Sequence, residues 1–151
     1  MARTASRGRR RLKDRKVELL RNVPLFSACT ERELKRIASL VEEVEAPEGK
    51  VLMRQGRPGT ECFVIADGRA KASMRGRKSV WLGPGSCVGE MSLLDGRPRS
   101  ATITAETPMR LLVLTSRDFS ALLDDVPEVG RRIMKALAVR LRDAERPRPE
   151  H

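Results

Sequence analysis

The sequence predicts an α+β fold that is mainly β: an antiparallel, jelly-roll-like β-roll (a double-stranded β-helix) with one short inserted helix. Three observations support this fold. Apolar residues recur at helical spacing near both ends of the chain. Between them, short runs with strand periodicity are separated by turn residues such as Asp67-Gly68 and Gly83-Pro84-Gly85. The segment from Cys87 to Arg99 interrupts these strands, so the inserted helix is expected there.

The N-terminal elements are predicted to be helices. Residues 1–11 are small, polar and basic, so we expect them to be mobile. A helical pattern over residues 12–21 stops before Pro24, because a proline pushes the preceding residue out of the helical region. Thr30-Glu31-Arg32-Glu33 has the form of a capping box, which predicts the start of a second helix.

Strand periodicity then replaces the helical pattern, and turn residues occupy each interval. The expected strands are Val51 to Met53, Cys62 to Ala66, Ala70 to Met74, Ser79 to Leu82, Ala101 to Ala105 and Arg110 to Leu114. Helices return afterwards, with Ser116 as the expected N-cap of a short helix through Leu123 and Pro127 in the first turn of a last helix. That last helix has an apolar stripe, for which we favour core packing over a dimer seam: Val129, Ile133, Leu137 and Leu141.

The length of 151 residues, with 40% hydrophobic residues, indicates one domain. We expect a basic mobile tail over residues 1–16 that runs into the first helix, a domain over residues 17–146 and a short tail over residues 147–151. Within the domain, the expected divisions are helices over 17–45, the β-roll over 46–115 and C-terminal helices over 116–146.

The positive charge is concentrated at the N-terminus. The formal net charge is +11, but residues 1–21 contain nine Lys or Arg against two acidic residues, and the other 130 residues have a net charge of only +4. The folded part therefore has an ordinary mixed-charge surface. A weak nucleic-acid contact through the basic N-terminal tail is an expectation from this composition.

Cysteine and histidine usage argues against several kinds of site. Cys29, Cys62 and Cys87 form neither an even-numbered disulfide framework nor a CxxC pair, and His151 is the only histidine. No catalytic triad and no His-based metal site remains, so the sequence predicts a protein that is not an enzyme and needs no metal, and it disfavours a cupin-like metal enzyme. No apolar run resembles a signal peptide or a membrane span, so we expect a cytoplasmic protein without membrane partners.

The most informative segment is Gly89 to Ala101, which combines a glycine, a short helix-capable run, a carboxylate and an arginine. Free N–H groups at the start of a short helix favour an anion. Arg99 can close over a phosphate with charge-assisted hydrogen bonds, while Glu90 accepts from a sugar hydroxyl. The pattern therefore predicts a site for a small sugar phosphate. An ion pair between Glu90 and Arg99 in the empty site is an alternative, and Arg97 is expected to face solvent.

These residues resemble the cyclic nucleotide-binding domain family, which includes the catabolite activator protein, protein kinase A regulatory subunits and cyclic nucleotide-gated channels. The resemblance covers about residues 17 to 145. It is carried by the following segments: Gly56 to Gly59, Cys62-Phe63-Val64-Ile65-Ala66-Asp67-Gly68, Gly83-Pro84-Gly85, and Gly89-Glu90 through Arg99-Ser100-Ala101. The family implies a non-catalytic receptor, here as a stand-alone domain, because the chain after the last expected helix is too short for a helix-turn-helix.

The resemblance also implies a set of binding residues. Glu90 would hold the ribose 2′-hydroxyl, and Arg99 with Ser100 would hold the cyclic phosphate. The backbone of Gly89, Met91 and Ser92 would meet the ribose and phosphate. Three further positions complete the expected set: Val88, Ala101 and Arg140. Arg140 lies on the last helix, near where some family members use an arginine to contact the purine. In the family this helix can swing over the base as a lid, and no Ser/Thr pair stands around Ala144 and Glu145 here.

The resemblance implies cyclic AMP as the ligand. Cyclic GMP is also allowed, because in the family the residue after the arginine decides between the two, and a serine there, Ser100, is permissive for both. We further expect an unidentified protein partner and a monomer or weak dimer. The alternative function is an adaptor with a degenerate pocket and a basic tail that binds protein or nucleic acid. Cys87, beside the expected site, is interpreted as a small buried hydrophobe rather than a redox sensor.

Overall fold

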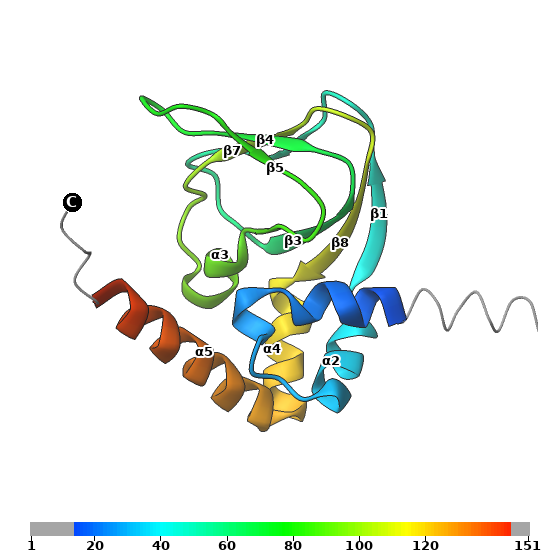
Figure 1. The fold of residues 1–151 in the computed structure, drawn as a ribbon, viewed down its shortest axis with the longest axis vertical. Coiled ribbons are helices and arrows are strands. Elements are labelled where there is room, and N and C mark those ends of the chain that lie inside the picture. The colour runs from blue at the N-terminus through cyan, green and yellow to red at the C-terminus, as the bar shows by residue number, and fades with distance from the viewer. Residues whose placement is uncertain (1–13, 146–151) are drawn as a thin grey trace, which may run out of the picture.

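The computed structural model describes residues 14–145 of the chain. Helices lie at both ends of this part, and strands with one short helix lie between them (Figure 1). The first helix covers residues 14–21. The elements that follow are η1 (Pro24–Phe26), α2 (Glu31–Ala38), β1 (Glu42–Ala46), β2 (Val51–Met53), β3 (Glu61–Asp67), β4 (Ala70–Ser73), β5 (Val80–Leu82), β6 (Cys87–Val88), α3 (Glu90–Asp95), β7 (Thr102–Ala105), β8 (Met109–Thr115), α4 (Ser116–Asp125) and α5 (Pro127–Glu145).

The strands form two antiparallel sheets that pack against each other as a β-roll. One sheet has the strand order β1-β8-β3-β6, and the other has the order β2-β7-β4-β5. The short helix α3 is inserted where the chain leaves β6 in the first sheet and enters β7 in the second. The α+β fold predicted from the sequence, with a β-roll, an inserted helix and helices at both ends, is confirmed.

The central strands β3 and β8 are buried on both faces. Along β3, Cys62 and Val64 belong to a core shared with the helices, whereas Phe63 and Ile65 belong to a core inside the roll. The strand β8 alternates between the same two cores. Because both faces are covered, these strands are continuous apolar runs rather than alternating ones.

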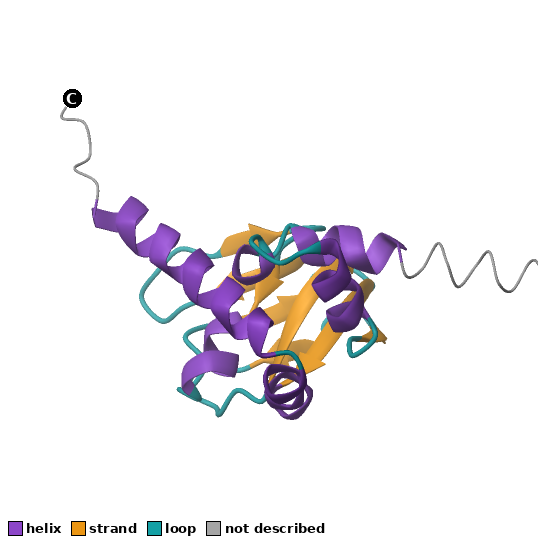
Figure 2. Ribbon diagram, turned by 90° about the horizontal axis from the view of Figure 1, so that it is seen from below, coloured by secondary structure: helices purple, strands orange, loops and turns teal. Residues whose placement is uncertain are grey.

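The helices gather on one side of the roll, next to the first sheet (Figures 1 and 2). The predicted capping box is present: Glu33 N donates to Thr30 Oγ1 at 3.2 Å, and Thr30 N donates to Glu33 Oε1 at 2.8 Å. The same carboxylate accepts from Arg132 Nε at 3.4 Å, so one buried side chain both starts α2 and fastens α5 to it. No helix within residues 14–145 is long and apolar enough to cross a lipid bilayer.

Several details differ from the sequence-based expectation. Residues 42–45, expected at the end of the helical part, form most of β1, and Cys87–Val88 forms an additional short strand. The N-cap of α4 is Thr115, whose side chain accepts from Asp118 N at 3.1 Å, and Ser116 is the first helical residue. The expected mobility of residues 1–11 and the expected tail over residues 147–151 lie outside the described residues.

The apolar stripe of α5 divides into two halves. Val129 and Ile133 are buried in the core shared with the other helices, and Leu137 packs at its margin. Leu141, in contrast, is 64% exposed, so the expectation of core packing is correct only for the first part of the stripe. The second half of the helix extends beyond the roll, as Figure 1 shows.

The core inside the roll predicts a clear stability difference between two aliphatic truncations. Ile65→Ala removes a side chain with 0% exposure and lowers the free energy of unfolding by about 2–5 kcal/mol. Val80→Ala, at a side chain that is 53% exposed, changes it by less than about 0.5 kcal/mol. Urea unfolding followed by circular dichroism measures both values, and equal losses would contradict the assignment of this core.

Candidate ligand-binding site

A cavity of about 530 Å³ opens beside α3 on the inner side of the second sheet. Eight of the nine residues predicted from the sequence line it: Val88, Gly89, Glu90, Met91, Ser92, Arg99, Ser100 and Ala101. The structure therefore gathers nearly the whole predicted set around one space. The ninth residue, Arg140, is exposed on the outer half of α5 and is not part of the lining.

The guanidinium of Arg99 is the most buried charge of this cavity, because the residue is only 6% exposed. Its Nη2 donates to the main-chain oxygen of Glu61 at 2.5 Å, and its Nη1 donates to that of Gly89 at 3.4 Å. A guanidinium has five N–H donors, so these two bonds leave others for a ligand. Burial lowers the pKa of Arg99 from its ordinary value, and the Glu61 carboxylate opposes this shift, so the group remains cationic.

The main chain around Arg99 is fixed by the loop before β3. Arg99 N donates to Arg57 O at 2.8 Å, and Gly56 N donates to Arg99 O at 2.8 Å. An isolated bridge between Pro58 and Pro98 continues this pairing. The loop carrying Gly56 to Gly59 therefore positions the arginine backbone, which gives that part of the sequence motif a structural role.

Two glycines make room for the Arg99 side chain. Gly89 has a φ of +85° as the N-cap of α3, and a Cβ on it would collide with Nη1 of Arg99. A Cβ on Gly59 would lie 2.7 Å from Arg99 Nε and equally close to the Ser92 side chain. A side chain at either position would have to displace the guanidinium or α3.

The carboxylate of Glu90 lies on the cavity wall and is partly buried. Within residues 14–145, the ion pairs do not include one between Glu90 and Arg99, so the alternative of a closed internal pair is not seen. A hydrogen bond with Cys62, together with burial, raises the pKa of the Cys87 thiol. A thiol of raised pKa is a poor nucleophile, which argues against a redox sensor, and Cys87 is a partly buried residue packed against the core shared with the helices.

The apolar part of the cavity wall was not predicted. It comes from Met53 of β2, Leu82 of β5 and Ile103 of β7, with Met74 from the turn after β4. Their strand-like runs were predicted, but no motif indicated which strand face would reach the site. Arg97 is exposed as expected, and it also borders the cavity with Asp95.

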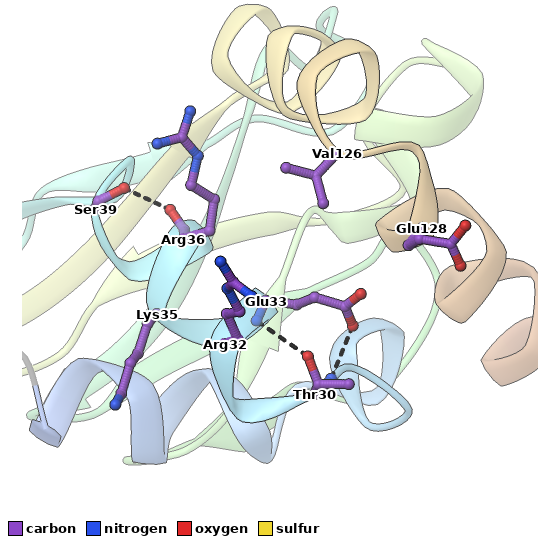
Figure 3. Close-up of a pocket in the computed structure, with 8 residues that line it drawn as sticks. All are labelled: Thr30, Arg32, Glu33, Lys35, Arg36, Ser39, Val126 and Glu128. Carbon is purple, nitrogen blue, oxygen red and sulfur yellow. Dashed lines mark hydrogen bonds between the residues drawn. The ribbon is translucent and has the colours of Figure 1, made fainter.

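A second hollow, of about 630 Å³, lies between α2 and the junction of α4 with α5 (Figure 3). Glu33 and Thr30 form the capping box on its floor, and Arg36 forms an ion pair with Asp125 at 3.6 Å. The ion pair joins α2 to α4 near Val126, where α4 ends and α5 begins. No group of three or more His, Cys, Asp or Glu side chains within residues 14–145 is arranged to hold a metal ion.

Comparison with known proteins identifies the family. Residues 43–126 match the cyclic nucleotide-binding domain. The cyclic nucleotide-gated potassium channel of Mesorhizobium japonicum is 37% identical over 127 residues, which are 84% of this chain and 35% of the channel. The cyclic AMP receptor protein of Thermus thermophilus is 33% identical over 131 residues, which are 83% of this chain and 61% of that protein.

The solved structures agree with this assignment. The N-terminal domain of a transcriptional regulator from Streptomyces coelicolor A3(2) superimposes with a TM-score of 0.77 and 32% identity, over 88% of this chain and 99% of that chain. The chain therefore belongs to the cyclic nucleotide-binding domain family. It spans 35% of the length of the channel and 61% of the length of the receptor protein.

The close packing around Arg99 predicts that Gly89→Ala destabilises the protein. The substitution forces a side chain into a left-handed conformation and against the guanidinium, which costs about 1–3 kcal/mol of unfolding free energy. Gly83→Ala is the matched control, because a Cβ there meets nothing within 4 Å. Thermal unfolding compares the two variants, and an unchanged midpoint for Gly89→Ala would contradict this geometry.

Proposed function

We propose that this chain is a non-catalytic receptor for a cyclic nucleotide, with cyclic AMP as the principal ligand, and that Arg99 holds the phosphate. The observation that carries the proposal is the buried, cationic side chain of Arg99 on the wall of an otherwise largely apolar cavity. Burying a charge is costly unless its hydrogen-bond donors find acceptors. Here two main-chain oxygens accept from Arg99, and its other N–H groups remain available. A phosphate is the partner that matches the remaining donors.

The residues around Arg99 suit the rest of a nucleotide. Glu90 would accept from the ribose 2′-hydroxyl, and Ser100 would add a hydroxyl beside the phosphate. The backbone of Gly89, Met91 and Ser92 would approach the ribose and phosphate closely, because Gly89 has no side chain. The apolar wall that includes Leu82 and Ile103 would cover the less polar parts of the ligand. The similarity to the cyclic AMP receptor protein of Thermus thermophilus supports this ligand class.

The proposal includes a movement of α5. Leu93 and Leu94 of α3 pack against the same core as Val129 and Ile133 of α5. A ligand that shifts α3 would therefore alter the surface on which α5 rests. The helix α5 exposes Met134 near its middle and Val139 and Leu141 in its outer half, with exposed fractions of 63%, 53% and 64%, so apolar surface is available to fold over the ligand. Pro127, at the start of α5, and Gly130 are the positions at which we expect the hinge.

Removing the guanidinium tests the phosphate assignment. Arg99→Ala should weaken cyclic AMP binding by about 2–5 kcal/mol, because a buried phosphate loses its charged partner. Arg97→Ala is the matched control, because Arg97 is an exposed arginine at the margin of the same cavity and should change the affinity little. Isothermal titration calorimetry gives both values, and an unchanged affinity in folded Arg99→Ala would remove the proposal.

Ligand binding should also order the C-terminal helix. Saturating cyclic AMP should raise the unfolding temperature of the protein and slow amide exchange over residues 127–145, because the bound nucleotide supplies contacts for the outer half of α5. Hydrogen–deuterium exchange read by mass spectrometry measures this. Exchange over residues 42–46 of β1 provides an internal reference, and equal exchange over residues 127–145 with and without ligand would contradict the movement.

A further inference from the structure

The β4–β5 hairpin is rich in cations, and its Lys71 and Trp81 alternate along the strands with Ala72 and Leu82, which line the cavity. Residues 69–89 include no acidic residue and five cationic ones, which with Trp81 we call the hairpin surface: Arg69, Lys71, Arg75, Arg77 and Lys78. No ion pair joins any of these five cations to another described residue. The turn between β4 and β5 projects beyond the rest of the roll in Figure 1, and Arg69 and the turn residues Arg75, Arg77 and Lys78 are exposed.

Trp81 lies at the centre of this surface. It is the only tryptophan of the chain and is 53% exposed. Trp81 pairs with Lys71 across the two strands, and the Lys71 Nζ lies 5.8 Å from the centroid of the indole ring. The Arg69 Cζ lies 4.8 Å from the same centroid. These cation–π contacts hold the indole ring in place at the surface. Tryptophan and arginine are the residue types that most often anchor a binding partner.

The hairpin also offers a free strand edge. In the described chain, β5 is the last strand of the order β2-β7-β4-β5, so its side away from β4 has no neighbouring strand. Val80 on this edge is 53% exposed. Unpaired N–H and C=O groups of an edge strand can pair with an extended peptide, which gains main-chain hydrogen bonds as well as side-chain contacts.

We propose that the hairpin surface binds an extended, acidic segment of a partner protein, which adds to β5 as a further strand. The main chain of the segment pairs with the free edge of β5. Its carboxylates meet the cations of the hairpin, and one of its apolar side chains packs on Trp81. This binding surface is separate from the phosphate contact at Arg99, so it does not depend on the proposed function.

The aromatic content of the chain favours a peptide over single-stranded nucleic acid. Proteins that bind single strands stack successive bases on several aromatic side chains. Here the chain has no tyrosine, and its three phenylalanines are buried: Phe26, Phe63 and Phe119 have exposed fractions of 1%, 6% and 2%. Trp81 is therefore a single platform. A lipid surface is disfavoured because the projecting turn from Arg75 to Lys78 has no apolar side chain to insert, and the exposed Val80 and Trp81 lie behind it on β5.

The single tryptophan allows a direct test in the full chain. The probe is a synthetic peptide that repeats Glu-Thr-Val-Thr, which places glutamate and valine on the same face of an extended strand. It is titrated at low ionic strength while Trp81 emission is recorded. We expect a saturable change in emission that weakens as salt is added. The same peptide with alternate residues N-methylated cannot pair with the edge, and it should bind roughly tenfold more weakly. Equal affinity of the two peptides would overturn the strand addition.

Charge variants test the position of the surface. Arg75→Gln, Arg77→Gln and Lys78→Gln together should weaken peptide binding by roughly tenfold at low salt. The control combines Arg32→Gln, Lys35→Gln and Arg117→Gln, three exposed cations on α2 and α4, and it should keep the affinity of the unmodified chain. Equal losses in both variants would overturn the assignment, because attraction would then depend on net charge alone.

Two further probes separate the partner classes. The first is an oligothymidylate, and the second is phosphatidylserine vesicles. If either changes Trp81 emission while the acidic peptide does not, the proposal is overturned in favour of a nucleic acid or a membrane. Cyclic AMP titration of the hairpin variant should give the affinity of the unmodified chain. This measurement distinguishes failure of the hairpin surface from failure of the nucleotide site.

Discussion

The buried guanidinium of Arg99 is the contact on which the architecture of the cavity depends. A charge taken out of water must be hydrogen-bonded, and this one is bonded to the first residue of β3 and to the N-cap of α3. Its main chain is paired with the loop at Gly56 and Arg57. Residues 56–61 and the N-cap of α3 therefore meet at one residue, Arg99, through its main chain and its side chain. Gly59 and Gly89 are required there because a Cβ would occupy the space of the guanidinium or of Ser92.

The same strands connect this charge to the helices. The strand β3 accepts the bond from Arg99 at Glu61 and then continues into both cores, with Phe63 inside the roll and Val64 toward the helices. The helix α3 also contributes to the helix core through Leu93 and Leu94. Cores are close-packed, so a displacement of α3 must be accommodated by its neighbours rather than absorbed locally. This is a physical route by which a ligand beside Arg99 would influence α5.

Much of this arrangement could be predicted from the sequence, because local signals were strong. The capping box at Thr30, the glycine turns and the run from Gly89 to Arg99 each have a local physical cause. The strand β1 was missed because residues 42–46 include three glutamates, and its pairing with β8 is a tertiary effect. The strand β6 is only two residues long, too short for a periodicity.

The polar lining of the cavity was predicted from the sequence, and its apolar lining was not. The carboxylate and the arginine are recognisable from their spacing, whereas the wall formed by Met53, Leu82 and Ile103 depends on the register of three separate strands. The bond from Arg99 to the Glu61 oxygen spans 38 residues, and a main-chain acceptor leaves no sequence signal. Arg140 lies outside the cavity because the outer half of α5 does not pack against the roll. The apolar stripe of α5 did not indicate where this packing would stop.

A crystal structure of the chain grown with cyclic AMP tests the central claim most directly. The account predicts the nucleotide in the cavity beside α3, with a phosphate oxygen about 2.7–3.2 Å from an Arg99 nitrogen and the ribose 2′-hydroxyl on Glu90. A nucleotide bound elsewhere, or bound in this cavity with its phosphate away from Arg99, would contradict it.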